Sequence, residues 1–184
     1  FPSRSVGDKQ PEHNRLYQAD ILRTEVDSIM NIRSHPQVII MGDFNDYPTN
    51  QSILKILKAE APPVKTNDLA STTDSANAST VTPSSLKLYH LLARKAKSKN
   101  FGSYKFRGEW GLLDHLIVSG TLLNQSNHFF TSEEKANVCL LPFLLKDDEK
   151  YGDKEPFRTY KGMKYQGGIS DHLPIYTDFE LILY

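Results

Sequence analysis

A carboxylate and a carboxamide follow a short apolar run early in the chain. Val38–Asn45 reads VIIMGDFN, and its unbroken apolar start predicts a strand that is buried on both faces. Asp43 and Asn45 stand just beyond Gly42, at the carboxyl end of that strand, where open α/β sheets usually hold their chemistry. Residues two apart in an extended chain point the same way, so both side chains can face one pocket. An Asx turn is the alternative for the same composition.

A second carboxylate lies inside an apolar segment. Asp114 belongs to LLDHLIVS, residues 112–119, which predicts a strand. A buried acid needs a partner or it takes up a proton, so either Asp114 is paired or its strand lies at the edge of a sheet. Its neighbour His115 points to the opposite face. We assign a structural role to His115 and to the other isolated histidines: His13, His35, His90 and His128.

An acid and an imidazole stand side by side near the end of the chain. Asp171 and His172 follow Gly167, Gly168 and Ser170, at the junction between a loop and the last predicted strand. Two glycines allow backbone segments to approach closely. A capped turn is the alternative to a functional pair.

The elements that would carry these residues alternate between helix and strand. A helix is predicted from Asn14, as its cap, to about Asn31. Residues 34–37 then form the turn into the Val38–Asn45 strand, which makes a helix-to-strand unit of the α/β kind. The buried stripe of that helix consists of apolar residues three and four apart: Ala19, Leu22, Val26, Ile29 and Met30.

The rest of the chain predicts further helices, strands and one long loop. Residues 50–60 and 86–99 have helical apolar spacing, and the second stretch ends in a basic run that suits a helix carboxyl terminus. Residues 61–85 are rich in Ser, Thr, Asn, Ala and Pro, which predicts a flexible surface insertion. The predicted strands are 101–107 with 112–119, as a hairpin or adjacent antiparallel pair, and the closing strand 175–183.

The composition fits a single domain over residues 1–184. Lys plus Arg and Asp plus Glu number 22 each, so the formal net charge is zero, whereas proteins dedicated to duplex nucleic acid are more usually basic. One cysteine, Cys139, excludes an internal disulfide and a multi-cysteine metal site. No apolar run approaches the roughly 20 residues that cross a bilayer, so no membrane span is expected. The chain begins at Phe1 without Met, which leaves the compartment open.

In this order, the motifs GDFN, LLDHLIVS and SDHLP resemble those of the endonuclease/exonuclease/phosphatase family. The resemblance runs from about Asn14 to the end of the chain and leaves the 61–100 region unmatched. It implies an α/β fold with a mixed β-sheet and helices packed on one face, which is one half of the family's four-layer α/β sandwich. The segment PFRTYKGMKYQGGISDHLP is similar to the secreted or periplasmic bacterial members.

The resemblance implies hydrolysis of phosphoester bonds with Mg²⁺ or Mn²⁺. Asp43 would position or deprotonate the attacking water, Asn45 would hydrogen-bond the phosphate, and Asp171, with Asp43, would bind the metal. His172 would stabilise the pentavalent phosphorane, and Asp114 would hold His172 in its orientation. These roles make physical sense, because phosphoryl oxygens gain charge in the transition state and fixed cations and donors stabilise it.

The substrate contacts expected from the sequence are Asn45, Arg4 and Trp110. Arg4 could meet a phosphate or remain a solvated loop residue, and Trp110 with Tyr104 could stack on a base or sugar or pack in the core. The substrate could be a nucleic acid, a nucleotide, or a sugar or lipid phosphate. Zero net charge and the lack of a strong basic, aromatic stripe in the sequence disfavour long duplex DNA.

One departure from the family pattern bears on activity. Family members have two similar α/β halves, and the first half supplies an asparagine and a metal-binding glutamate that nothing in residues 1–37 matches. The chain is therefore expected to be the carboxyl half, inactive or weakly active alone. We expect it to associate with itself or with an amino-terminal half. The alternative function is a non-catalytic α/β module that binds a protein partner or a phosphorylated ligand.

Overall fold

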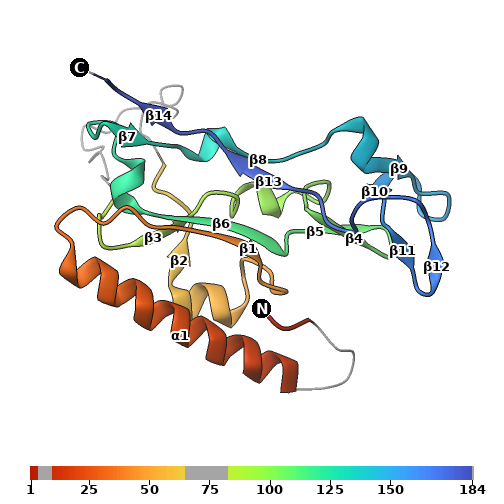
Figure 1. Ribbon diagram of the computed structural model, residues 1–184, viewed down its shortest axis with the longest axis horizontal. Coiled ribbons are helices and arrows are strands. Elements are labelled where there is room, and N and C mark those ends of the chain that lie inside the picture. Colours follow the sequence, from red (N-terminus) through yellow and green to blue (C-terminus); the bar gives the residue numbers. More distant parts are fainter. Residues whose placement is uncertain (4–9, 65–82, 184) are drawn as a thin grey trace, which may run out of the picture.

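The computed structural model describes residues 1–3, 10–64 and 83–183. Its main sheet has the strand order β1-β6-β3-β2 (Figure 1). Both β1 and β3 run antiparallel to β6, whereas β2 runs parallel to β3, so the prediction of an α/β protein with a mixed sheet is confirmed. The bounds of these strands are Ile39–Asp43 for β1, Ala59–Glu60 for β2, Leu88–His90 for β3 and Asp114–Ser119 for β6.

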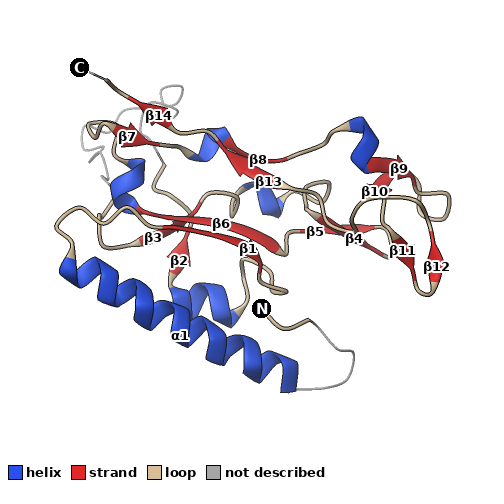
Figure 2. Ribbon diagram, viewed as in Figure 1, coloured by secondary structure: helices blue, strands red, loops and turns tan. Residues whose placement is uncertain are grey.

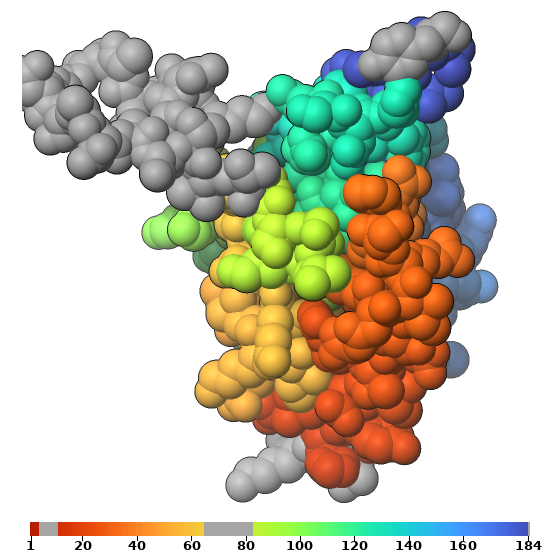
Figure 3. Space-filling model, turned by 90° about the vertical axis from the view of Figure 1, so that its left-hand side faces the viewer, coloured from red at the N-terminus to blue at the C-terminus, as the bar shows by residue number. Residues whose placement is uncertain are grey.

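Helix α1 (Gln10–Ile32) and the π-helical turn η1 (Ser52–Leu57) pack together against the main sheet (Figures 1 and 2). On the surface in Figure 3 the orange α1 and the yellow η1 region lie side by side. Alternate residues of β6 reach this layer, with Ile117 completely buried. The buried members of this core are Ala19, Val26, Met30, Val38, Phe44, Ile53, Leu57, Ala59, Leu88 and Ile117.

The other face of β6 is covered by the last part of the chain. Leu116 and Val118 pack there with Val138 and Leu173, beside the paired strands β8 (Ala136–Val138) and β13 (Ile175–Thr177). The remaining strands form two-stranded pairs around this layer: β4 (Tyr104–Phe106) with β5 (Glu109–Gly111), β9 (Leu145–Asp147) with β10 (Lys154–Pro156), β11 (Tyr160–Lys161) with β12 (Lys164–Tyr165), and β7 (Phe129–Phe130) with β14 (Glu180–Leu181). Short 3₁₀ turns lie at Lys95–Lys97, Gly120–Leu123, Glu133–Lys135 and Pro142–Leu144.

The predicted burial of the Val38–Asn45 strand on both faces is wrong. β1 lies at an end of the sheet and pairs only with β6 among the described strands. Its inner face supports α1, but Ile39 and Met41 on the other face are 44% and 57% exposed. Apolar composition alone does not show how many layers cover a strand, because β-branched residues favour strands both at the centre and at the edge of a sheet.

The helix predicted over residues 86–99 is also wrong. Leu88–His90 form β3, paired with both β6 and β2, and only Lys95–Lys97 make a helical turn. Leu88, Leu91 and Leu92 are buried as expected, but strand pairing with β6 determines the backbone. Short apolar runs fit both periodicities, so tertiary pairing decides between them.

Several boundaries differ from the predictions. α1 begins at Gln10, so Asn14 lies inside the helix and is not its cap, and the predicted 50–60 helix is confined to Ser52–Leu57. The hairpin partner of β4 is β5 rather than residues 112–119, and the closing strand is split into β13 and β14. Most of the predicted 61–85 insertion lies outside the described residues. None of the described helices is apolar enough over a sufficient length to cross a membrane.

Candidate functional site

The register of β1 against β6 brings two predicted site residues together. Asp43 is the last residue of β1 and pairs directly with Asp114, the first residue of β6. Residues opposite each other in an antiparallel pair place their side chains on the same face of the sheet. The Asp43 side chain is exposed, and Asp114 is partly buried. Two carboxylates therefore meet at one end of the two adjoining strands.

His172 completes this cluster from the far end of the sequence. Its Nδ1 lies 2.6 Å from Asp114 Oδ2, and ligand-type atoms of Asp43, Asp114 and His172 all lie within 4.8 Å of one another. The Ser103 hydroxyl donates a second hydrogen bond to Asp114 Oδ2. Asp114 is therefore the paired acid that one of the two sequence alternatives required, and its strand is central in the sheet rather than at the edge.

Backbone contacts on both sides hold His172 in place. A Cβ on Gly168 would lie 2.0 Å from the Phe157 carbonyl oxygen, so the close backbone approach expected here is confirmed for Gly168. The Ser170 hydroxyl accepts a hydrogen bond from the His172 amide at 3.1 Å, which makes a capped turn. Next to it, the Leu173 amide donates to the Ser103 carbonyl at 2.7 Å. The same turn that caps the backbone thus orients the imidazole.

The carboxylates around His172 favour its charged form. Burial is the largest single influence on the pKa of His172 and acts to lower it. The hydrogen bond and charge of Asp114 act in the opposite direction, and the charges of Asp43 and Asp171 add to them. The net result is a pKa raised above the ordinary value of 6.5. An imidazolium whose Nδ1–H donates to Asp114 has its Nε2–H left to donate to an anionic group.

Asn45 lies in an Asx turn that closes on Asp43. The Asn45 backbone amide donates to Asp43 Oδ1 at 2.7 Å, and the side-chain Nδ2 donates to Asp43 Oδ2 at 3.1 Å and to the Phe1 carbonyl at 2.9 Å. The backbone φ of Asn45 is 50°, a left-handed conformation that asparagine tolerates better than most residues. The Asx turn given as the alternative for this sequence is therefore present, and it keeps the Asn45 amide beside the Asp43 carboxylate.

The other predicted site residues are placed differently. Asp171 is exposed and acts on His172 through its charge, but it does not join the three-residue cluster. Trp110 is partly buried against the core on the Lys105 face of the β4–β5 hairpin, whereas the Tyr104 ring lies 4.9 Å from the His172 ring. Arg4 lies outside the described residues.

The sequence analysis missed a buried polar network behind the Asp43–Asn45 turn. Asp46 is 2% exposed; its carboxylate lies 2.9 Å from Arg15 Nε of α1 and accepts a hydrogen bond at 2.6 Å from the Ser52 hydroxyl of η1. Its backbone carbonyl lies 2.8 Å from His115 Nε2. α1, η1 and β6 therefore all hold this turn. The sequence held one indication of this network, since Asp46 is next to Asn45 and His115 is next to Asp114, both predicted site residues.

His115 and His90 form a buried pair whose tautomers are fixed by their neighbours. The Leu92 amide donates to His90 Nδ1 at 3.1 Å, so this nitrogen carries no proton and His90 Nε2 is the donor to His115 Nδ1, 2.6 Å away. His115 Nε2 is then the donor to the Asp46 carbonyl. Burial lowers the pKa of His90 well below 6.5 and that of His115 to about 4. Both imidazoles are therefore neutral at pH 7, in the structural role expected for them.

The chain is thus an α/β protein with a polar site where β1 ends and β6 begins. Asp43 and Asp114 meet there, His172 joins them from the loop before β13, and Asn45 lies in the adjoining turn. The family model described as "Endonuclease/Exonuclease/phosphatase family" matches residues 1–73 and 65–181. The chain belongs to this family, as its motifs indicated. No match was found among curated proteins or among solved structures.

The neutral histidine pair predicts a loss of stability in mild acid. The pKa of His115 is lower in the folded than in the unfolded chain. The contribution of His115 to the free energy of unfolding is therefore present above about pH 6.5 and is lost as the pH falls towards about 4. The corresponding decrease in the free energy of unfolding is about 3 kcal/mol. We expect urea titrations between pH 7 and pH 4 to show it. The raised pKa of His172 acts in the opposite direction, at higher pH.

The matched variant carries His90→Asn and His115→Gln, which removes both titrating imidazoles and retains amide groups. It should be less stable than the wild type at pH 7 but lose less free energy of unfolding between pH 6.5 and pH 4. Equal pH slopes for the two proteins would show that the histidine pair is not the source of the acid sensitivity.

Proposed function

We propose that this site hydrolyses phosphoester bonds of the diester or nucleic-acid type with a bound divalent metal. The observation that carries the proposal is the contact of Asp43, Asp114 and His172, three residues from distant parts of the sequence whose ligand-type atoms lie within 4.8 Å. A module that only binds a partner would not require an imidazole oriented by one carboxylate, with its pKa raised, beside an exposed acid. That binding module remains the alternative function.

The donor set fits Mg²⁺ or Mn²⁺. These hard cations take carboxylate oxygens and retain several waters, and they commonly use one or two protein carboxylates together with substrate phosphate. Asp43 is exposed, and the hydrogen bonds that it accepts at its carboxylate come from Asn45. We assign Asp43 and Asp171 to the metal. The bound cation would lower the pKa of its water and offset charge on the phosphoryl oxygens.

The chain's own residues would then act in fixed roles. Asp43 orients or deprotonates the attacking water, and Asn45 exchanges its 3.1 Å contact with Asp43 for a phosphate oxygen. His172 donates Nε2–H to the phosphoryl oxygens as their negative charge grows, which stabilises the transition state. Asp114 holds the imidazolium through Nδ1 and is itself held by Ser103.

The outer face of β1 supports a second part of the proposal, on the assembly of the site. Ile39 and Met41 lie on the same face as Asp43 and are exposed. We propose that residues 1–184 form one α/β unit, that a second α/β half packs on this face as the other half of a four-layer sandwich, and that it completes the metal site. Without it, the chain would be inactive or weakly active.

Metal binding by the 184-residue chain tests the proposed chemistry. Titration with MnCl₂ in a calorimeter should show binding that is lost in Asp43→Asn, because that substitution removes the charge while keeping the size of the side chain. The control is Asp147→Asn, whose carboxylate is 82% exposed and pairs with Lys154 away from the site. Absence of binding at millimolar metal, or equal binding by the wild type and Asp43→Asn, would contradict the metal assignment.

Self-association tests the proposed assembly. Exposed apolar side chains on one face favour association, so the chain should elute above its monomer mass at high concentration in size-exclusion chromatography with light scattering. Met41→Lys should shift it towards the monomer. Ile21→Lys is the control, because Ile21 is 47% exposed on α1, on the far side of the sheet from this face. A clean wild-type monomer at high concentration would count against the assembly.

A further inference from the structure

A row of aromatic rings leads away from the catalytic cluster along β4. The Tyr104 ring lies 4.9 Å from the His172 ring, and the Phe106 ring lies 6.4 Å from Tyr104 with its plane tilted by only 12°. Tyr104 and Phe106 are two residues apart in a strand, so they share one face. Phe106 is 54% exposed. An extended ligand whose phosphate meets His172 would therefore run over these rings.

An arginine guanidinium lies over each ring of this row. Arg158 Cζ lies 6.0 Å from the Tyr104 ring centre, and Arg107 Cζ lies 5.1 Å from that of Phe106. Among the described residues, no carboxylate lies within ion-pair distance of either arginine. Arg158 donates to the Lys105 carbonyl at 3.2 Å, while its Nε is buried without a hydrogen-bond partner in the described chain. Both positive charges are therefore unneutralised by described carboxylates.

The backbone at Arg107 is unusual for its residue type. Arg107 and Gly108 have φ angles of 52° and 87° and form the two-residue connection between β4 and β5. Positive φ at both positions is the mark of a type I′ turn, in which Asn, Asp or Gly is preferred at the first position. An arginine there opposes the local preference. Such outliers cluster at ligand sites, so the position favours a role for the side chain.

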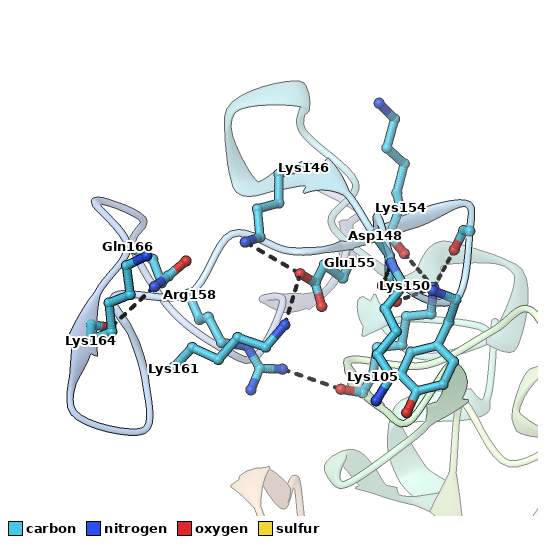
Figure 4. A network of polar contacts seen from close by, with 12 residues as sticks. Lys105, Lys146, Asp148, Lys150, Lys154, Glu155, Arg158, Lys161, Lys164 and Gln166 are labelled. Carbon is cyan, nitrogen blue, oxygen red and sulfur yellow. Dashed lines mark hydrogen bonds and ion pairs between the residues drawn. The ribbon is translucent and has the colours of Figure 1, made fainter.

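A buried lysine on the other face of β4 holds the 148–154 segment in place. Lys105 points to the other face of β4, where its Nζ lies 3.1 Å from Asp148 Oδ2 and donates to the Gly152 and Lys154 carbonyls (Figure 4). Gly108 also permits close packing, since a Cβ there would lie 3.0 Å from Tyr151 Cβ. The 148–154 segment is therefore held firmly beside the β4–β5 hairpin.

An electropositive cleft of about 320 Å³ adjoins the Phe106 end of the row, and Phe106, Arg107 and Arg158 are among the residues that line it. Five cations and two carboxylates line it, and both carboxylates are paired, Asp148 with Lys105 and Glu155 with Lys146 and Lys161. Lys150 Nζ lies 4.8 Å from the Tyr151 ring centre, which repeats the combination of ring and cation within the cleft. The cleft therefore carries a local excess of positive charge, although the net charge of the whole chain is zero.

We propose that this row and cleft bind a single strand of nucleic acid on one side of the hydrolysed phosphate. Bases stack on Tyr104 and Phe106, and successive phosphates meet Arg158 and Arg107. Alternating rings and cations are how proteins bind single strands without sequence preference. An inositol phosphate offers a saturated ring with no π face, so it would not use the aromatic members. This inference rests on the proposed function, because it names the substrate class of the same site.

The test measures binding without hydrolysis. Fluorescence anisotropy in EDTA follows a labelled oligothymidylate of about ten nucleotides on the 184-residue chain. Phe106→Ala and Arg107→Gln should each weaken binding by about fivefold or more. Arg107→Gln should also lower the slope of log affinity against log salt by about 0.7, because one phosphate contact is lost. Phe106→Ala should leave this slope unchanged.

The controls are Tyr17→Ala and Arg33→Gln, two exposed side chains on and just after α1. They remove the same kinds of group elsewhere on the surface and should change the affinity by less than about twofold, as nonspecific charge effects do at a single position. Circular dichroism and thermal unfolding confirm that each variant folds. Equal effects of Phe106→Ala, Arg107→Gln and the controls would overturn the proposal.

Competing ligands identify the class. Tighter binding of the single strand than of the same sequence as a duplex supports the proposal, and equal binding of the two overturns it. Inositol hexakisphosphate is the second competitor. The proposal would be overturned if it competed at the same concentration as the oligonucleotide and if Phe106→Ala did not change its affinity. The cleft would then be an anion site that does not recognise bases. Because all binding is measured without metal, a failure of metal-dependent hydrolysis would contradict the proposed function separately.

Discussion

The antiparallel register between β1 and β6 determines where the two carboxylates of the site, Asp43 and Asp114, stand. Asp43 opposes Asp114 only in this register, and a slip of one residue would send each side chain to the opposite face. The register is secured by the alternation on β6, where Ile117 faces the α1 layer and Leu116 faces the β8–β13 layer. Hydrophobic packing on two sides of one central strand thus fixes the carboxylate positions.

The second requirement is a buried set of polar groups behind the site. Asp46 lies in the interior and is held by Arg15, Ser52 and the neutral His115, whose protons are directed by the chain of hydrogen bonds through His90. Among the described residues, Arg15 Nε and Nη1 and Asp46 Oδ1 are buried without a hydrogen-bond partner, so Arg15 and Asp46 meet as an ion pair, while Ser52 and His115 supply the hydrogen bonds. The result is a firmly held turn that carries the exposed Asp43 and the partly buried Asn45.

Much of the candidate site could be predicted from local sequence, because GDFN and the Asp171–His172 pair lie at ends of strands that their apolar neighbours define. The α/β class followed from the helix-to-strand pattern, and the mixed sheet from the resemblance to the family. The exposure of β1 could not be predicted, since Ile and Val report strand preference and not the number of covering layers. Nor could β3, where leucine spacing fits a helix but pairing with β6 prevails. Tyr104 was recognised from the sequence as a possible stacking residue, but its association with Arg158 was not, because Arg158 is distant in sequence.

The central claim is that Asp114 orients His172 beside Asp43 and raises its pKa. The most direct measurement is a pH titration of the imidazole nitrogens of His172 by ¹H–¹⁵N NMR, in the wild type and in Asp114→Asn, which keeps an acceptor and removes the charge. The account predicts a wild-type pKa above 6.5, in the direction that the three carboxylates impose, and a lower pKa in the variant. A wild-type pKa at or below 6.5, or the same pKa in both proteins, would contradict it.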